Sequence, residues 1–339
     1  MFNPQVLAAL RRAGHAPLTR LAQMEEQLRG RFAFADEAIQ ALVLALASGE
    51  PLLLIGPPGT GKSRLIRAAC GMMGLIGDED GQDHPDYFEY LLTPFTEPGE
   101  LFGFYDIPRA MQGDLARLDS GMMQKARVVY LDEVFNGSSA ILNSILAFLN
   151  ERVFHDRGLR VPVRLEALLA ATNIIPTTSE LRAVFDRFTL RCHIDNTAAR
   201  PELLGELLQK GWRETYGSEA WVAADGDLLD QLARFRDLLR EQTALGRLQP
   251  AGDHPLQRKL AQIIHLARQY ELSQMSNRRV IKLIHVMVVH RIYRAVRDGE
   301  EDQTALDLGG PELQLINRFF LDEQDEELAF KLERLAQVS

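Results

Sequence analysis

The sequence predicts an α/β protein whose core is a five-stranded parallel β-sheet and whose second half is helical. Three observations lead to this fold class. Strand-like apolar runs alternate with helical or loop segments, an order that produces parallel βαβ units covered by helices on both faces. A glycine-rich loop joins the first of these runs to a helix. After Ile194, helical patterns replace the strand-like runs.

Five short runs, rich in apolar residues, supply the predicted strands. They are Leu52–Ile55, Tyr87–Leu92, Val128–Leu131, Leu165–Ala171 and Thr189–Ile194. Amphipathic spacing predicts two helices before them, Gln5–Arg12 and Leu18–Leu28, and Asp36 is placed to cap a third over Glu37–Ala47. Further helices are expected at Arg64–Gly71, Arg200–Tyr216, Asp227–Glu241, Pro255–Glu271, Ser276–Arg297 and within Pro311–Ala336.

A chain of 339 residues is too long for one small core, because domains usually run about 100 to 200 residues. We expect four regions. They are an N-terminal helical segment (1–33), an α/β core (34–197), a helical domain (198–298) and a C-terminal helical tail (299–339).

The composition narrows the class of function. A net charge of -9 argues against generic binding to nucleic acid or to an anionic membrane, which needs a basic face. No apolar run approaches the roughly 20 residues that a membrane span requires. The N-terminus does not resemble a secretory signal, and Cys70 and Cys192 do not suggest a disulfide framework. We therefore expect a cytoplasmic protein.

A complete phosphate-binding loop follows the first strand. The pattern G-x-x-x-x-G-K-[ST] is matched in full by Gly56, Pro57, Pro58, Gly59, Thr60, Gly61, Lys62 and Ser63. Glycines let successive amides point inward at phosphate oxygens, and the start of the following helix adds partial positive charge. Lys62 is expected to reach the β- and γ-phosphates, and the Ser63 hydroxyl to bind Mg²⁺. A chance glycine-rich turn would lack this strand and helix context.

Two acids end the third predicted strand. In a parallel sheet the carboxyl end of Val128–Leu131 opens beside the phosphate-binding loop. Asp132 is then placed to support Mg²⁺, and Glu133 to polarise an attacking water. Neighbouring residues on an extended strand point to opposite faces, so the two acids can have different roles. By itself, such a pair is often only a solvated strand end.

Asn173 ends the next strand, and its amide could hold the attacking water or contact the γ-phosphate; the alternative is an ordinary turn residue. Three arginines, Arg182, Arg187 and Arg191, cluster in LRAVFDRFTLRCHI. A guanidinium suits the phosphate charge of a transition state, within the chain or on a neighbouring subunit, but Asp186 is also a ready partner. Ser276 is a good helix cap, and an arginine one or two positions later could also reach a nucleotide.

These residues, in this order, resemble the AAA+ superfamily and more narrowly the MoxR-type ATPases of the RavA kind. The resemblance covers about Phe34 to Arg297. The stretches that carry it are EAIQALVLALASGEPLLLIGPPGTGKS, FEYLLTPFTEPGELFG, LDEVFNGSSAILNSILAFLNERVFHDRG, AATN and LRAVFDRF.

The resemblance implies an αβα ATPase core with a helical lid, and a hexameric ring that binds ATP and Mg²⁺ between subunits. By position, Asn173 is similar to the first sensor, Arg187 to the arginine finger, and Arg278 to the second sensor, with Arg279 as the alternative. Segment Thr96–Gly103 resembles the helix that leads into an inserted hairpin at Phe104–Asp119, near the pore. A second hairpin is expected at His155–Val163.

Proteins of this kind act like chaperones, remodelling or activating partners, often together with a von Willebrand A (vWA) domain protein. With residues 299–339 after the lid, we do not expect the large client-binding domain of RavA, so a RavA-specific client is not expected either. Two alternatives remain. A nucleic-acid motor is disfavoured by the charge of -9 and by the few bases in the first hairpin, Arg109 and Arg117. A slow nucleotide-dependent switch is disfavoured by the intact Glu133.

Overall fold

The computed structural model describes residues 2–77, 84–196, 200–217, 227–250, 252, 254–301 and 306–322. Its centre is a five-stranded sheet with the order β2-β3-β6-β1-β7, in which every neighbouring pair is parallel. The strands are β1 (Leu52–Ile55), β2 (Tyr87–Leu91), β3 (Val128–Asp132), β6 (Ala167–Thr172) and β7 (Leu190–His193). The predicted α/β fold with a five-stranded parallel sheet is confirmed.

Alternate strand residues enter two separate apolar cores, as a sheet covered on both faces requires. Leu52 and Leu54 of β1 enter the larger core, whereas Leu53 and Ile55 enter the smaller one. The larger core is packed by α1 (Pro4–Arg31), α2 (Asp36–Ser48), α3 (Lys62–Met72), α9 (Leu228–Ala244), α10 (Pro255–Gln269), α11 (Asn277–Arg297) and α12 (Gly310–Phe319). The smaller core contains α4 (Pro98–Phe102), α6 (Ser139–Glu151), α7 (Ser179–Phe185) and the short helix η1 (Val134–Asn136).

The N-terminal region is one long helix, and the prediction of two helices was wrong. Helix α1 runs through Pro17, whose ring removes one backbone hydrogen bond without ending the helix. Packing of α1 against α9 and α11 outweighs this local cost, as the burial of Leu10 and Leu18 on either side of the proline indicates. The proposed cap of the next helix is also corrected: Ala35 is its N-cap, and Asp36 lies in its first turn.

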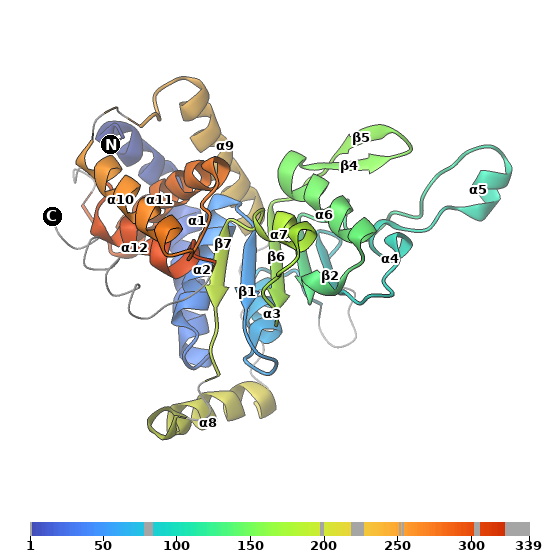
Figure 1. The fold of residues 1–339 in the computed structure, drawn as a ribbon, viewed down its shortest axis with the longest axis horizontal. Helices are drawn as coiled ribbons and strands as arrows, with labels where there is room; N and C mark the ends of the chain where they lie inside the picture. Colours follow the sequence, from blue (N-terminus) through green and yellow to red (C-terminus); the bar gives the residue numbers. More distant parts are fainter. Residues whose placement is uncertain are drawn as a thin grey trace.

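Two excursions leave the sheet on the side of α6 (Figure 1). Strands β4 (Val153–Asp156) and β5 (Leu159–Pro162) form an antiparallel hairpin. The longer excursion carries α5 (Ile107–Met111) near its tip and is closed by one bridge between Tyr105 and Arg117. Arg117 ties the two excursions together, because its Nε donates to Asp156 at 2.9 Å.

The helices after β7 occupy opposite ends of the sheet. The pair α11 and α12 lies beside the starts of β1 and β7, where Lys282 donates to Glu50 at 2.8 Å. By contrast, α8 (Pro201–Tyr216) lies beyond the ends of these strands (Figure 1). The described residues after β7 contain no further strand. The division into four regions stays a prediction. The predicted helix within Pro311–Ala336 lies partly outside the described residues, which end at 322. No described helix has the length and apolar character that a membrane span needs.

Substituting Gly14 by alanine tests the close approach of α1 and α9. A Cβ at Gly14 would meet the buried ring of Phe235 at 2.7 Å, whereas a Cβ at Gly30 of the same helix meets nothing within 4 Å. We expect Gly14→Ala to lower the free energy of unfolding, because overpacking costs roughly 1–3 kcal/mol and exceeds the gain in helix propensity. Gly30→Ala should raise it slightly. Urea denaturation measures both; equal stabilisation by the two substitutions would contradict the contact.

Candidate nucleotide-binding site

The predicted phosphate-binding loop connects β1 to α3 in a conformation that needs its glycines. Gly56 N donates to Thr172 O at 3.1 Å, and a Cβ on Gly56 would lie 2.3 Å from the carbonyl oxygen of Ile194. Gly59 and Gly61 have φ values of 81° and 83°, in the left-handed region that side chains disfavour. The loop is therefore wedged between the ends of β6 and β7, at the edge where a parallel sheet binds ligands.

Lys62 folds back over this loop. Its side chain is buried, and Nζ donates to the carbonyls of Gly56 and Pro57 at 2.7 and 2.9 Å. Burial lowers the pKa of Lys62, and the nearby carboxylates Glu133 and Asp132 partly oppose this shift. A phosphate chain in the loop would supply the negative charge that this half-satisfied ammonium lacks.

Ser63 and Asp132 meet across the gap between α3 and β3. The Ser63 hydroxyl donates to Asp132 Oδ2 at 2.8 Å, so a hydroxyl and a carboxylate oxygen lie together beside the loop. Hard oxygen donors of this kind suit Mg²⁺, which takes few protein ligands and completes its shell with phosphate and water. Among the described residues, no group of three or more His, Cys, Asp or Glu could hold a metal alone. The pair fits a nucleotide-bound Mg²⁺ better than a separate metal site.

Glu133 directly follows β3, and its backbone N–H donates to Asp132 Oδ1 at 3.0 Å. Its backbone is left-handed, with φ 49°, an uncommon conformation for a residue with a side chain. One carboxylate oxygen, Oε2, accepts a weak bond from Asn173 N at 3.4 Å. The ends of β3 and β6 are neighbours in the sheet, which brings the acid and Asn173 together. Local strain of this type often accompanies a functional constraint.

Arg187 lies at the opposite edge of the sheet from the loop. It follows α7 and precedes β7, whose first residue, Leu190, donates to Pro51 O before the start of β1. A four-residue strand spans roughly 13 Å, so the loop and Arg187 are separated by at least that length. Nη1 of Arg187 donates to Asp186 at 3.1 Å, the partner foreseen from the sequence.

Arg278 and Arg279, the two arginines considered for the second sensor, also lie at that end of the sheet. Arg278 is exposed on the first turn of α11, and nearby Ser276 donates to Asp186 at 3.3 Å. Arg279 is buried and donates to the carbonyl of Phe320 at 2.8 Å. Packing thus removes Arg279 as a candidate. Arg191 is excluded for the same reason, since its side chain is 1% exposed.

A cavity of about 190 Å³ adjoins the loop and has the position expected for a base and sugar. The segment between α1 and α2, including Phe32 and Phe34, forms one wall, and Ile194 with the residues after β7 forms another. Helix α8 closes it with Leu207 and Gly211. Sequence reasoning missed these walls, because they come from three distant segments without a shared motif.

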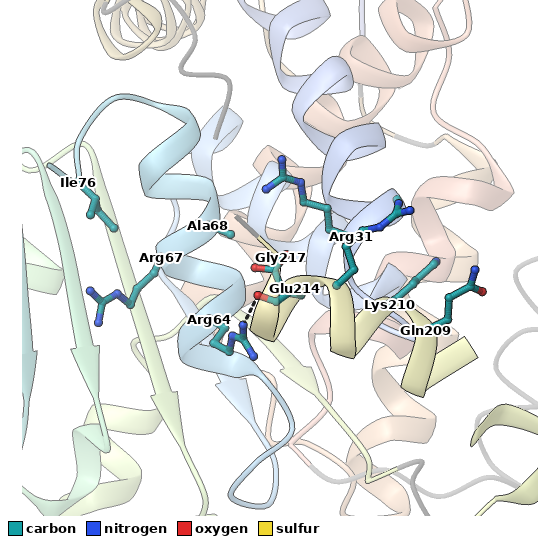
Figure 2. A pocket seen from close by; sticks show the side chains of 11 residues that line it. Arg31, Arg64, Arg67, Ala68, Ile76, Gln209, Lys210, Glu214 and Gly217 are labelled. Carbon is teal, nitrogen blue, oxygen red and sulfur yellow. Dashed lines mark hydrogen bonds between the residues drawn. The ribbon is translucent and has the colours of Figure 1, made fainter. Parts of the chain in front are cut away.

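Arg64 fastens α8 to the loop helix. Its guanidinium donates to Thr215 Oγ1 at 2.7 Å. It also donates to the Glu214 carbonyl at 2.6 Å, the bond drawn in Figure 2. Lys210 adds a bond to Arg29 O at 3.0 Å. A second cavity of about 560 Å³ lies beneath this junction and is rich in basic side chains. Arg64 and Lys210 already donate to α8 and α1, and Arg67 lies 3.7 Å from Glu89. We therefore assign these basic side chains to the packing of α8 and not to a separate ligand site.

Comparisons with known proteins yield one family model and several relatives. A family model described as the MoxR domain in the MoxR-vWA-beta-propeller ternary systems matches residues 19–233. Two uncharacterized proteins of Methanocaldococcus jannaschii are each 35% identical, over 51% and 50% of this chain. The match spans only 43% of the length of each relative. An aliphatic sulfonates import ATP-binding protein of Pseudomonas savastanoi pv. phaseolicola is 28% identical over 36% of this chain and 67% of its own.

One solved structure matches nearly the whole fold. The crystal structure of a candidate ATPase from Cytophaga hutchinsonii covers 97% of this chain and 97% of its own, with a TM-score of 0.60 and 16% identity. At this identity the likeness concerns the fold, including the helices after the sheet. It does not test individual site residues.

Arg64→Ala should loosen α8 and so weaken nucleotide binding. Loss of two hydrogen bonds at a partly solvated junction is expected to raise the Kd for ATP about three- to tenfold. Arg67→Ala, one turn later on α3, is the matched control, since Arg67 pairs only at 3.7 Å with Glu89. Titration with a fluorescent ATP analogue measures both. Equal affinities for the two variants would mean that α8 does not shape the pocket.

Proposed function

Because this chain belongs to the MoxR family of AAA+ ATPases, we propose that it hydrolyses ATP as a ring of identical subunits and uses the cycle to remodel or activate a protein partner. One observation supports the proposal of a ring with shared sites. The loop with its acids and the Arg187 segment lie at opposite edges of one sheet. A single subunit therefore cannot bring Arg187 to its own phosphates, and a second copy supplies it.

The chemistry follows from the groups around the loop. Lys62 exchanges its carbonyl partners for the β- and γ-phosphate oxygens, and the loop amides hold the chain in line. Glu133 orients a water and accepts its proton as the water oxygen attacks the γ-phosphorus and the bond to the ADP oxygen breaks. Asn173 steadies the same water or the γ-phosphate. Ser63 and Asp132 would hold Mg²⁺, which would supply positive charge against the phosphate chain.

The neighbouring subunit supplies cations for the transition state. Arg187 is half-buried beside Asp186, and a phosphate would compete with this carboxylate for its guanidinium. Arg278, exposed two residues after the Ser276 contact to Asp186, is a second cation on the same edge. We therefore expect Arg278 to act, together with Arg187, on the nucleotide of the neighbouring subunit and not on the nucleotide of its own subunit.

The partner is a protein. The family model's description supports a vWA-domain protein, and adds a β-propeller protein as a further member of the assembly. The excursion between β2 and β3 exposes apolar side chains suited to such contacts, including Ile107, Met111 and Leu118. The net charge of -9 favours this over nucleic acid. A RavA-like subgroup, a hexameric ring and a cytoplasmic location complete the proposal.

Glu133→Gln tests the hydrolytic role. The amide keeps the shape of the side chain but cannot accept a proton, so ATP binding should persist while turnover falls by about 100-fold or more. Steady-state phosphate release and nucleotide titration separate the two. If Glu133→Gln hydrolysed ATP at the wild-type rate, Glu133 would not be the base, and a binding switch would become the better account.

Arg187→Ala tests the shared site. The pure variant should lose roughly 1,000-fold in turnover, because an arginine that stabilises transferring phosphate contributes on that order. Titrated into wild type, it should lower the activity more than simple dilution does, since each variant subunit disables a neighbour. Arg182→Ala, an exposed arginine of the same segment, is the control. Strict proportionality to the wild-type fraction would argue against the ring.

A further inference from the structure

A cluster of buried polar side chains around Asp322, whose own carboxylate is partly exposed, joins three parts of the fold. Oδ1 of Asp322 accepts bonds from Arg191 of β7, from Arg279 of α11 at 2.8 Å and from Ser273 at 2.9 Å. Backbone bonds fix the same corner: Asp322 N donates to Leu272 O at 2.8 Å, and Arg279 donates to the Phe320 carbonyl at 2.8 Å. A single carboxylate, after the last described helix, thus binds the sheet and the α10–α11 junction together.

The two guanidiniums depend on this carboxylate. Arg191 and Arg279 are each 1% exposed, and the Nε atom of each has no hydrogen-bond partner within the described part of the chain. Burial lowers the pKa of Arg279 to about 10, and Asp186 partly offsets this shift. Buried charges are costly unless paired and hydrogen-bonded. Asp322 is the carboxylate that bonds both cations directly, and it holds them at one point.

From this point, two routes lead to the Arg187 turn. Arg191 donates to the Phe185 carbonyl at 2.8 Å, and its guanidinium lies 3.8 Å over the Phe185 ring, which fixes the end of α7. On the other route, Arg279 lies in the first turn of α11, where its backbone N–H donates to the cap Ser276, which donates to Asp186. Asp186 in turn holds Arg187. Phe185 and Asp186, the two residues that precede Arg187, are therefore held by Arg191, which bonds Asp322, and by Ser276, which caps the turn that contains Arg279.

We propose that Asp322 is a positioning residue for the arginine edge: through Arg191 and Arg279 it fixes the turn that presents Arg187 to the next subunit. The inference rests on the proposed function, because it requires Arg187 to act on a neighbour. It also gives the C-terminal segment a role in catalysis, since the residue that holds the turn lies far along the chain from the nucleotide loop. Removing the negative charge of Asp322 should displace Arg187 from the neighbour's site and leave the nucleotide pocket of the variant subunit itself intact.

Complementation between inactive subunits tests this assignment. Glu133→Gln subunits lack the base but keep the arginine, whereas Arg187→Ala subunits lack the arginine but keep the base. Mixed together, they should recover activity at interfaces that combine the two intact halves. Asp322→Asn should lose roughly tenfold or more in kcat with little change in KM for ATP, as expected for an interaction made in the transition state. It should then regain activity when mixed with Glu133→Gln and gain none with Arg187→Ala.

The outcomes separate the possible failures. Recovery of Asp322→Asn with Arg187→Ala would overturn the inference, because the defect would lie in its own pocket. Wild-type kcat for Asp322→Asn would overturn it too. If Glu133→Gln and Arg187→Ala do not complement each other, the shared site itself fails, and the inference with it. Asp298→Asn, an exposed carboxylate beside Arg297, is the control and should match wild type. Asp322→Glu keeps the charge and should retain most of the wild-type kcat. If Asp322→Asn is insoluble, Asp322→Glu alone carries the test, and a kcat as low as that of Arg187→Ala would overturn the inference.

Discussion

The register of β1 between β6 and β7 is the constraint on which the rest of the site depends. Leu52 faces Leu169 on one side and Leu190 on the other, so the three strands end together. Their ends bring the loop, Asn173 and Ile194 to one edge, and the close approach of Ile194 leaves room only for glycine at position 56. The same register carries the Arg187 turn to the other edge. In a parallel sheet all strands start at one end and finish at the other. In this chain the nucleotide loop lies where the strands finish, and the Arg187 turn lies where they start.

The helices after the sheet are divided between its two ends in the same way. One of them, α8, reaches the loop edge and closes the cavity there, held by Arg64. The later helices pack at the arginine edge and share the larger apolar core with α1 and α2. Each group is therefore placed to respond to a different event. On the proposed function, a nucleotide at the loop would contact α8, whereas a change in the α11–α12 corner would act on the arginine turn through Asp322.

Much of the fold could be predicted from the sequence because the signals are local. The strands are short apolar runs, and the loop, Asp132 and Glu133 follow strand ends where a parallel sheet places ligands. The failures involve residues whose role depends on distant packing. The sequence pattern predicts separate helices before and after Pro17, but α1 continues through it because the helix packs along α9 and α11. Arg278 and Arg279 look equivalent in sequence, and only burial against the end of α12 distinguishes them. The cavity walls came from segments with no motif at all.

The central claim is that one subunit holds only part of a catalytic site. It is tested most directly by measuring ATP turnover per subunit over a range of protein concentrations, with the assembled fraction followed by light scattering in the same samples. The account predicts that turnover per subunit rises in parallel with assembly and is nearly absent in the monomer. Full turnover by a monomer, independent of concentration, would contradict it.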